Sequence, residues 1–319
     1  MVPARGFALD YIAIGGFLGK GLGQKLIFPG QLMISILQSY GHLRRRRPEV
    51  VLGTGGYVSA PPVLAAKLLG IPSALLALDA MPSKAVRLLA NLACEIYAGF
   101  PECADFIKEP WKVIFTGNPL RSDLGRYSRD QGAMAFGLDP QRKTVLAYGG
   151  SRGAHRINLV LCQAVVSREE RWSDLQFILQ TGEQDHGWVK REMEAARAKA
   201  VVLPYIENMG LAFAACDLVI SRSGSTVSEI LNCGLPSILI PYPYAASNHQ
   251  EYNARSLERA GAAVVIMDSE LSASGLADEI DRLINNEALR KRMAQNSKSL
   301  ARPGAAREIA KRLERIRKK

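Results

Sequence analysis

Two glycine turns in the sequence are candidates for binding a phosphate group. One occupies residues 53–59 and includes Gly55 and Gly56, and the other occupies residues 149–154 and includes Gly149, Gly150 and Gly153. Each follows an apolar β-branched stretch and precedes a helical stretch, which directs backbone N–H groups and a helix N-terminus at an anion. Neither matches the P-loop or the dinucleotide-binding fingerprint. Tight packing of a strand on a helix also explains such turns, but a pair of them favours a ligand between two domains.

A third candidate site is the run Ser-Arg-Ser-Gly-Ser-Thr-Val-Ser-Glu at residues 221–229, directly after an apolar stretch. Around Gly224, backbone amides and the hydroxyls of Ser225 and Thr226 could face a diphosphate. Glu229 would lie one turn inside the next helix, where its carboxylate can accept hydrogen bonds from ribose hydroxyls. The same pattern also fits a Ser/Thr helix cap followed by an acidic first turn.

A polar cluster follows the next apolar stretch. Gln250, Glu251 and Asn253 lie close together after a proline-rich loop, and their side chains suit the hydroxyl groups of a sugar. A polar loop that opens a helix is the alternative interpretation.

The elements that must position these residues form two similar halves. Short, continuously apolar strands alternate with helical stretches, which predicts an α/β fold with parallel sheets covered on both faces. We expect an N-terminal domain at residues 1–121, a linker at 122–142, a C-terminal domain at 143–300 and a basic C-terminal helix at 301–319. The first half is short and opens without a strand and glycine turn, so we expect an opening βαβ element to be missing from it.

Charge and composition narrow the class of partner. The net charge is +11, and residues 290–319 hold twelve Lys/Arg against two Asp/Glu, without an aromatic residue. Nucleic-acid binders usually spread basic residues over a folded face, often with aromatics among them, so no nucleic-acid partner is expected. The five cysteines show no spacing of a zinc site or disulfide framework and fit a reducing compartment. An apolar stretch at residues 26–40 precedes Arg44–Arg47. It is either a buried helix or a helix that docks on an anionic membrane. No stretch is long and apolar enough for a transmembrane helix.

Six motifs in order resemble one family. They are Gly-Gly-Tyr-Val-Ser at 55–59, Gly-Asn-Pro-Leu-Arg at 117–121, Gly-Gly-Ser-Arg-Gly-Ala at 149–154, Tyr-Ile-Glu-Asn-Met at 205–209, Arg-Ser-Gly with Thr-Val-Ser-Glu at 222–229 and His-Gln-Glu-Tyr-Asn-Ala at 249–254. Together they resemble the MurG family of peptidoglycan N-acetylglucosaminyltransferases, which have a GT-B fold. The resemblance implies an inverting hexosyltransferase that moves N-acetylglucosamine from UDP-N-acetylglucosamine to an undecaprenyl-linked muramoyl-pentapeptide, converting lipid I to lipid II. It also implies a peripheral enzyme at the cytoplasmic face of the cell membrane.

The resemblance implies roles for individual residues. Ile206 would contact the uracil, Glu229 the ribose, and Arg121 the nucleotide. The diphosphate and sugar ligands would be Ser151, Ser225 and Thr226, and Gln250 with Glu251. Such enzymes need no metal or other cofactor, because a helix dipole and backbone donors stabilise the departing UDP.

The sequence departs from the family's pattern at three places. It lacks the family's opening Gly-Gly-Thr-Gly-Gly-His turn, so we expect a first domain truncated at its N-terminus. Leu76-Ala77-Leu78-Asp79 replaces the family's His-Glu-Gln-Asn, which leaves Asp79 as the candidate for the base that takes the acceptor's proton. The loop at residues 222–229 is one residue shorter than in several relatives. A non-catalytic protein that binds a UDP-sugar is therefore the alternative to an active transferase.

Overall fold

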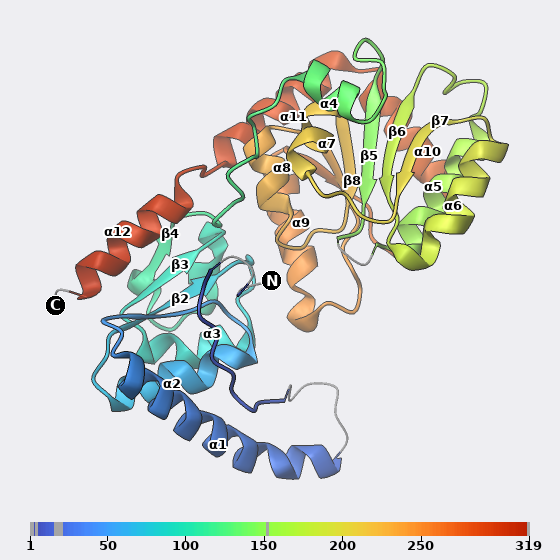
Figure 1. Cartoon of the computed structure of the whole chain (residues 1–319). Helices are drawn as coiled ribbons and strands as arrows, with labels where there is room; N and C mark the ends of the chain where they lie inside the picture. Colours follow the sequence, from blue (N-terminus) through green and yellow to red (C-terminus); the bar gives the residue numbers. More distant parts are fainter. Residues whose placement is uncertain (1–2, 4–5, 16–21, 151–152, 318–319) are drawn as a thin grey trace. The chain divides into compact units, whose positions relative to one another are not determined.

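The computed structural model describes residues 3, 6–15, 22–150 and 153–317, and it divides the chain into two compact units (Figure 1). The first unit comprises Met1–Gly117 together with Gly304–Lys319, and the second comprises Asn118–Pro303. The chain therefore crosses into the second unit and returns to the first near its end. The C-terminal helix, expected as a separate basic segment, packs within the first unit, and the expected linker at 122–142 contributes a helix to the second.

The first unit is built on a four-stranded parallel sheet with the strand order β1-β2-β3-β4. Its strands are β1 (Val51–Gly53), β2 (Ser73–Ala77), β3 (Glu95–Ala98) and β4 (Val113–Phe115), and its α-helices are α1 (Leu22–Arg46), α2 (Ala60–Leu68), α3 (Lys84–Leu89) and α12 (Ala305–Arg317). Short 3₁₀ helices are η2 (Tyr57–Ser59), η3 (Ala90–Leu92), η4 (Pro101–Phe106) and η5 (Pro110–Lys112).

Both faces of this first sheet are covered. Leu75 of β2 packs with Val63 and Val86 on the side of α2 and α3. The next residue, Leu76, points to the opposite face, where it packs in one cluster with Ile309 of α12, because side chains alternate along a strand. The basic α12 is thus an amphipathic helix whose apolar stripe completes the core of the first unit.

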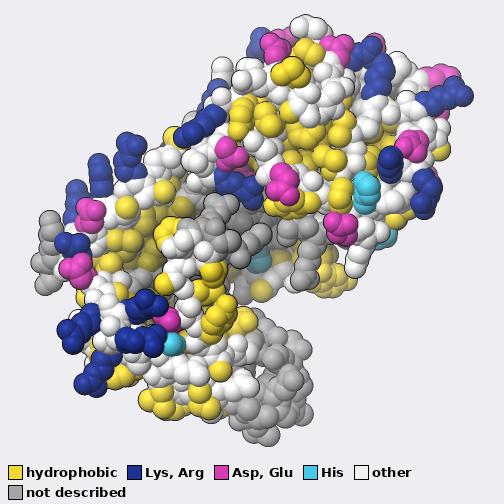
Figure 2. Space-filling model, in the orientation of Figure 1, with side chains coloured by type: hydrophobic (Ala, Val, Ile, Leu, Met, Phe, Trp, Pro, Cys, Tyr) yellow, Lys and Arg dark blue, Asp and Glu magenta, His cyan; other side chains and the backbone are white. Residues whose placement is uncertain are grey.

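Helix α1 packs against α2. Contrary to the usual arrangement, polar side chains of α1 are buried and apolar ones are exposed. The side chains of Ser35 and Ser39 are buried, whereas Met33, Ile34 and Leu37 are 58%, 52% and 63% exposed. Figure 2 shows yellow hydrophobic side chains along α1 and dark blue Lys and Arg side chains gathered over α12 and near the end of α1. An exposed apolar face of this kind commonly marks an interaction surface.

The second unit is built on a six-stranded parallel sheet with the order β10-β9-β8-β5-β6-β7. Its strands are β5 (Thr144–Tyr148), β6 (Gln176–Gln180), β7 (Lys199–Leu203), β8 (Leu218–Ser221), β9 (Ser237–Leu239) and β10 (Ala263–Val265). Its helices are α4 (Arg129–Ala135), α5 (His155–Ser167), α6 (Glu183–Ala195), α7 (Met209–Ala215), α8 (Val227–Cys233), η6 (Ala246–Asn248), α9 (His249–Arg259), α10 (Ala273–Ile284) and α11 (Glu287–Leu300).

This strand order is that of a doubly wound sheet, and it has one switch point. The chain runs outward from β5 through β6 to β7, then returns to β8 on the other side of β5 and continues through β9 to β10. Tyr148 at the end of β5 pairs with Ser221 at the end of β8. The connections that leave β5 and β8 diverge to opposite faces, and ligands of open α/β sheets bind in the crevice that this divergence creates at the carboxyl ends of the strands.

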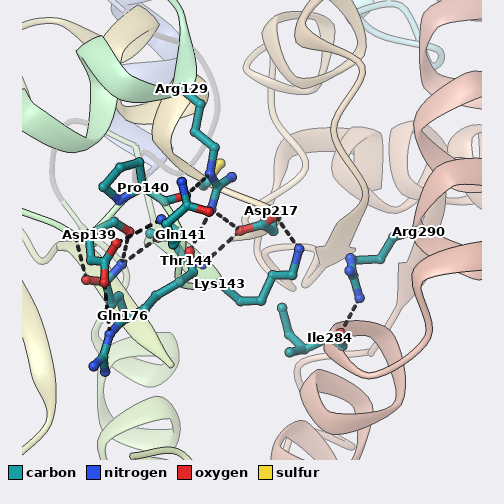
Figure 3. Close-up of polar contacts among 12 residues, drawn as sticks. Arg129, Asp139, Pro140, Gln141, Lys143, Thr144, Gln176, Asp217, Ile284 and Arg290 are labelled. Atoms are coloured by element: carbon teal, nitrogen blue, oxygen red, sulfur yellow. Dashed lines mark hydrogen bonds and ion pairs between the residues drawn. The ribbon is translucent and has the colours of Figure 1, made fainter. Parts of the chain in front are cut away.

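The amino edge of the same sheet is closed by polar contacts among its own residues (Figure 3). The Asp217 carboxylate accepts hydrogen bonds from Arg129 Nη2 at 2.8 Å and from the Thr144 amide at 2.9 Å, and its other oxygen lies 3.4 Å from Lys143 Nζ. Gln176 exchanges two hydrogen bonds of 2.9 Å with the backbone of Asp139. These contacts join the loop before β5 to the starts of three strands.

Candidate functional site

The glycine turn after β5 is held by the end of β6. The Gly150 carbonyl accepts hydrogen bonds from Gln180 Nε2 at 2.8 Å and from the Gly153 amide at 2.9 Å. Gly153 has a φ of +75°, and a Cβ there would lie 1.8 Å from the Thr181 carbonyl oxygen. A Cβ on Gly149 would lie 2.3 Å from Ala154 Cβ. Both positions require glycine, because the turn is pressed against the backbone of the next strand and against itself.

The turn leads into α5, whose first amides make no capping hydrogen bond with the N-cap side chain. The N-cap position is occupied by Ala154, whose side chain cannot accept a hydrogen bond from the first turn. The first N–H groups of a helix have no intrahelical partner, and together with the helix dipole they favour an anion. The amino end of α5 lies at the switch point, so a phosphate is the group that this edge of the sheet suits best.

Glu229 lies in the first turn of α8, on the other side of the switch point. Its side chain is 15% exposed, and Arg121 Nε lies 3.8 Å from Oε1. Burial raises the pKa of Glu229, the Arg121 guanidinium opposes that rise, and Asp123 adds to it. The carboxylate is therefore a poorly solvated acceptor, which gains from hydrogen bonds that a ligand can donate.

The segment that carries Arg121 is fixed by a buried contact. Asn118 Nδ2 donates a hydrogen bond of 2.8 Å to Ser228 Oγ, and both residues are buried. The next residue along α8 is Glu229. The contact therefore places Arg121 and Glu229 side by side, although more than a hundred residues separate them in the chain.

The loop after β8 and the start of α9 hold each other. Ser223 Oγ donates to the Gln250 carbonyl at 2.7 Å, and Asn253 Nδ2 donates to the Ser223 carbonyl at 3.0 Å. The Gln250 side chain accepts from the Tyr242 amide at 3.0 Å and lies next to Gly224, where a Cβ would be 3.7 Å from Nε2. This arrangement brings the predicted sugar-binding residue to the predicted diphosphate loop.

The remaining predicted ligands are distributed around this edge. Ser225 is exposed and Thr226 half-buried, directly before α8, while Glu251 is half-buried and hydrogen-bonded to Asn248. The Ile206 side chain is only 3% exposed, so its backbone is the part that can face a base. Ser151 lies outside the described residues. The roles of these residues stay predictions, and the described ones belong to loops at the carboxyl edge of the second sheet or to the helices that follow them.

Comparison with known proteins assigns the chain to a family. The model of the glycosyltransferase family 28 C-terminal domain matches residues 144–312, and that of the family's N-terminal domain matches residues 1–98. The chain belongs to glycosyltransferase family 28. The family resemblance predicted from the motifs is confirmed, and so is the GT-B fold with two parallel-sheet α/β units.

Two curated relatives illustrate how close the chain is to this family, and both are named UDP-N-acetylglucosamine--N-acetylmuramyl-(pentapeptide) pyrophosphoryl-undecaprenol N-acetylglucosamine transferase. The relative from Halothermothrix orenii is 40% identical over 96% of this chain and 84% of its own length. The relative from Thermodesulfovibrio yellowstonii is 37% identical over 97% of this chain and 84% of its own length.

Solved structures agree with the family. The crystal structure of Acinetobacter baumannii MurG matches with a TM-score of 0.78 and 27% identity, over 98% of this chain and 87% of that one. The UDP-GlcNAc 2-epimerase from Neisseria meningitidis, solved with UDP-GlcNAc bound, has a TM-score of 0.65 at 14% identity, over 89% of this chain and 82% of that one. The second match indicates a shared fold only.

The family 28 chain has a second glycine turn, in its first unit. Gly55 and Gly56 have φ values of +85° and +70° and follow β1 at the edge of the sheet. Ser59 Oγ donates to the Gly55 carbonyl at 2.6 Å, whereas a Cβ on Gly56 would meet nothing within 4 Å. Asp79, the candidate base, is half-buried and follows β2 at the same carboxyl edge of this sheet.

Sequence reasoning did not give a role to several residues that support the site. Gln180 and Thr181 hold the glycine turn from the neighbouring strand, and Asn118 fixes the segment with Arg121. Tyr148 fills the space below the loop after β8. A polar residue at the carboxyl end of an apolar strand is the only sequence signal that marks Gln180 and Tyr148, and it does not say which loop they contact.

Two features are missing from the described part of the chain. None of its helices is long and apolar enough to cross a membrane. Nor do its His, Cys, Asp and Glu side chains form a group of three or more that could hold a metal ion.

Proposed function

We propose that this chain transfers N-acetylglucosamine from UDP-N-acetylglucosamine to an undecaprenyl-linked muramoyl-pentapeptide, with inversion at the sugar carbon. The proposal is carried by the switch-point site, which has a phosphate-suited turn and the half-buried carboxylate of Glu229. The chain belongs to family 28, and its relatives have this activity in their names. The function belongs to peptidoglycan synthesis and so to the building of the cell wall.

In this mechanism the second unit binds the donor. The amides at the start of α5 and the hydroxyls of Ser225 and Thr226 receive the diphosphate, while Glu229 accepts hydrogen bonds from the ribose. Gln250 and Glu251 hold the sugar. As the bond between the sugar and UDP breaks, negative charge builds up on the diphosphate, and donors already in place stabilise that charge without reorganising.

The first unit provides the base in this proposal. An acceptor hydroxyl attacks the sugar carbon from the side opposite UDP and must lose its proton, and general-base catalysis contributes roughly 10²–10⁴-fold to the rate of such a step. Asp79 is the carboxylate that stands at the corresponding edge of the first sheet. In the stretch at residues 76–79, Leu76 packs in the hydrophobic core. This position therefore supplies no polar group to the reaction.

A transfer assay with radiolabelled UDP-N-acetylglucosamine and the lipid-linked acceptor tests the function. We expect labelled disaccharide-lipid with the chain as given, and about a hundredfold or greater loss of kcat in Asp79→Asn, with the affinity for UDP unchanged. Product formation that is unaffected by Asp79→Asn would refute the role of Asp79. Binding of UDP without transfer would instead support a non-catalytic sugar-nucleotide-binding protein.

We also propose that α1 docks the enzyme on the cytoplasmic face of an anionic membrane. Its exposed residues Met33, Ile34 and Leu37 give it an apolar face. Arg44, Arg45 and Arg46 end the helix, Arg47 follows it, and all four are exposed. Arg45 and Arg46 contact Asp10, whereas no ion pair with a described residue is seen for the other two arginines of this run, Arg44 and Arg47. Basic residues near an anionic surface contribute about 1 kcal/mol each.

Vesicle binding tests this docking. Met33→Glu combined with Leu37→Glu should weaken binding to phosphatidylglycerol vesicles at least tenfold, because two charges would then enter the apolar interface. Leu88→Glu is the matched control, since Leu88 lies in α3 of the same unit and is 79% exposed. Equal binding by the double variant and by the control would show that α1 is not the docking face.

A further inference from the structure

Tyr148 occupies the last position of β5, directly before the glycine turn. It is 2% exposed, and its ring packs edge-on against Phe213 of α7, with 5.9 Å between the centroids. Its hydroxyl is enclosed and has no hydrogen-bond partner within the described chain. Buried polar groups nearly always have such a partner, so an orphaned hydroxyl at the switch point requires an explanation.

Three polar groups near this hydroxyl come from the end of β8 and the start of α8. The hydroxyls of Thr226 and Ser221 approach it, and the Glu229 carboxylate lies near it. Burial raises the pKa of Tyr148 most strongly, Thr226 and Ser221 oppose the rise, and Glu229 adds to it. The phenol is therefore held in its protonated form, with a hydrogen available to donate.

Of the two neighbouring hydroxyls, Thr226 is the one available as an acceptor partner in a chain of hydrogen bonds to a ligand. Ser221 Oγ already donates its hydrogen to the Arg222 carbonyl at 2.9 Å, so this hydrogen is not available to a ligand. Thr226 is the N-cap residue of α8, yet its side chain makes no capping hydrogen bond, and it is half-buried rather than enclosed. It thus lies between the enclosed phenol and the open edge of the sheet.

We propose that Tyr148 is a positioning residue for the donor's diphosphate and acts through Thr226. When the donor is bound, Tyr148 donates to Thr226 Oγ1 and Thr226 donates to a phosphate oxygen, so that the two hydroxyls form a relay from the core to the ligand. The proposal rests on the proposed function, because it takes the diphosphate at this loop as given.

The chemistry of the two hydroxyls favours this direction. A threonine hydroxyl has one hydrogen and two lone pairs, so it can receive the phenol's hydrogen while giving its own to an anion. Hydrogen bonds to an anion are the strong ones, and each donor in a chain strengthens the next. The unpaired hydroxyl would then destabilise the free protein, and its hydrogen bond in the complex would stabilise the bound state. Functional sites commonly have this compromise between stability and binding.

Tyr148→Phe should have opposite effects on the stability of the free protein and on its affinity for UDP. The free protein should melt about 2 °C higher, because an unpaired buried hydroxyl is removed, while the Kd for UDP should rise about tenfold. Binding of uridine, which has no phosphate, should be unchanged. A hydroxyl that only fills space would leave the Kd for UDP unchanged, and that result would overturn the relay. An equal loss of uridine binding would also overturn it, since the site as a whole would then have been disturbed.

A double-mutant cycle tests the step through Thr226. Thr226→Val keeps the shape of the side chain and removes its hydroxyl, so it should weaken UDP binding at least as much as Tyr148→Phe does. In the Thr226→Val background, Tyr148→Phe should cause no further loss, because the relay is already broken. Additive losses would show that Tyr148 acts without Thr226 and would refute the proposal.

Tyr97 supplies a matched control. It lies in β3 of the first unit, is fully buried, and also has a hydroxyl without a hydrogen-bond partner in the described chain. Tyr97→Phe should leave the Kd for UDP unchanged. If the unmodified chain binds no UDP, the proposed function itself fails; if it binds UDP and Tyr148→Phe binds it equally well, only the relay fails.

Discussion

At the amino edge of the six-stranded sheet Asp217 is surrounded by Arg129, Lys143 and the Thr144 amide. At the carboxyl edge the loops hold one another, but the enclosed Tyr148 hydroxyl has no hydrogen-bond partner among the described residues. Ala154 leaves the first amides of α5 uncapped, and the pKa of Glu229 is raised chiefly by burial. The two edges lie only one strand length apart in the same sheet.

The difference separates stability from binding. A carboxylate with three donors lowers the free energy of the folded chain, so the amino edge contributes to holding strands and loops together. Donors and acceptors without protein partners raise that free energy, and a ligand that satisfies them recovers the cost as binding energy. We therefore expect substitutions at the amino edge to change the melting temperature, and substitutions at the carboxyl edge to change the affinity for UDP.

The largest effect is expected from Gly153→Ala at the carboxyl edge. The added Cβ would meet the Thr181 carbonyl, and φ is positive, so we expect about 3 kcal/mol of destabilisation or a displaced turn. Calorimetry should show at least a tenfold weaker binding of UDP. Gly150→Ala is the control, because its φ is also positive but its Cβ would lie in open space. Equal effects of the two would mean that contact with β6 does not shape the turn.

A smaller effect is expected from Asp217→Ala at the amino edge. The substitution removes the acceptor of the Arg129 and Thr144 hydrogen bonds and the ion-pair partner of Lys143. We expect the free energy of unfolding to fall by about 2 kcal/mol, since the two cations are partly exposed. Thermal unfolding measures the loss. The Kd for UDP, measured well below the melting temperature, should stay unchanged. A weaker affinity would show that the two edges are not independent.

The smallest effect on stability, and a distinct pH signature, is expected from Glu229→Gln. A raised pKa means that the stability contributed by protonated Glu229 is present below its unfolded-state pKa and is lost as pH rises through the folded-state value. At neutral pH the variant should therefore be as stable as the unmodified chain or slightly more so, with UDP bound about fivefold more weakly.

Binding as a function of pH completes this test. In the unmodified chain, affinity for UDP should fall as pH decreases through the raised pKa of Glu229, because the protonated carboxyl is a poorer acceptor for ribose hydroxyls. Glu229→Gln should lose that part of the pH dependence and keep the part that comes from the terminal phosphate of UDP. The same pH dependence in both proteins would assign the titration to another group.

Much of the fold could be predicted from the sequence, because its signals are local. The stretches at residues 143–148 and 218–221 predict strands of a parallel sheet, and the observed strands are β5 at Thr144–Tyr148 and β8 at Leu218–Ser221. Glycines before a helix predict a phosphate-suited turn. Contacts between distant segments have no local sequence signal. The hydrogen bonds from Asn118 to Ser228 and from Gln180 to Gly150 form because the strand order brings these segments together.

Helices α1 and α12 show the same limit. The sequence predicted that the apolar stretch at residues 26–40 would either be buried or form a docking face. Which residues are exposed, such as Met33, and which are buried, such as Ser35, depends on how α1 packs on α2. The sequence predicted a separate basic helix at residues 301–319. Its isoleucines Ile309 and Ile316 in fact pack on the first sheet, which periodicity alone does not assign to a particular partner.

The amino-acid sequence by itself determined the class of the fold, the family and the places where glycine and hydroxyl residues interrupt the strands, because these depend on neighbours along the chain. Only the tertiary structure decided that the turns after β5 and β8 lie side by side, that the half-buried Glu229 lies beside Arg121, and that the enclosed Tyr148 hydroxyl has no hydrogen-bond partner among the described residues. These features depend on strand order and on which groups exclude water from one another, and both arise only when segments far apart in the chain pack together.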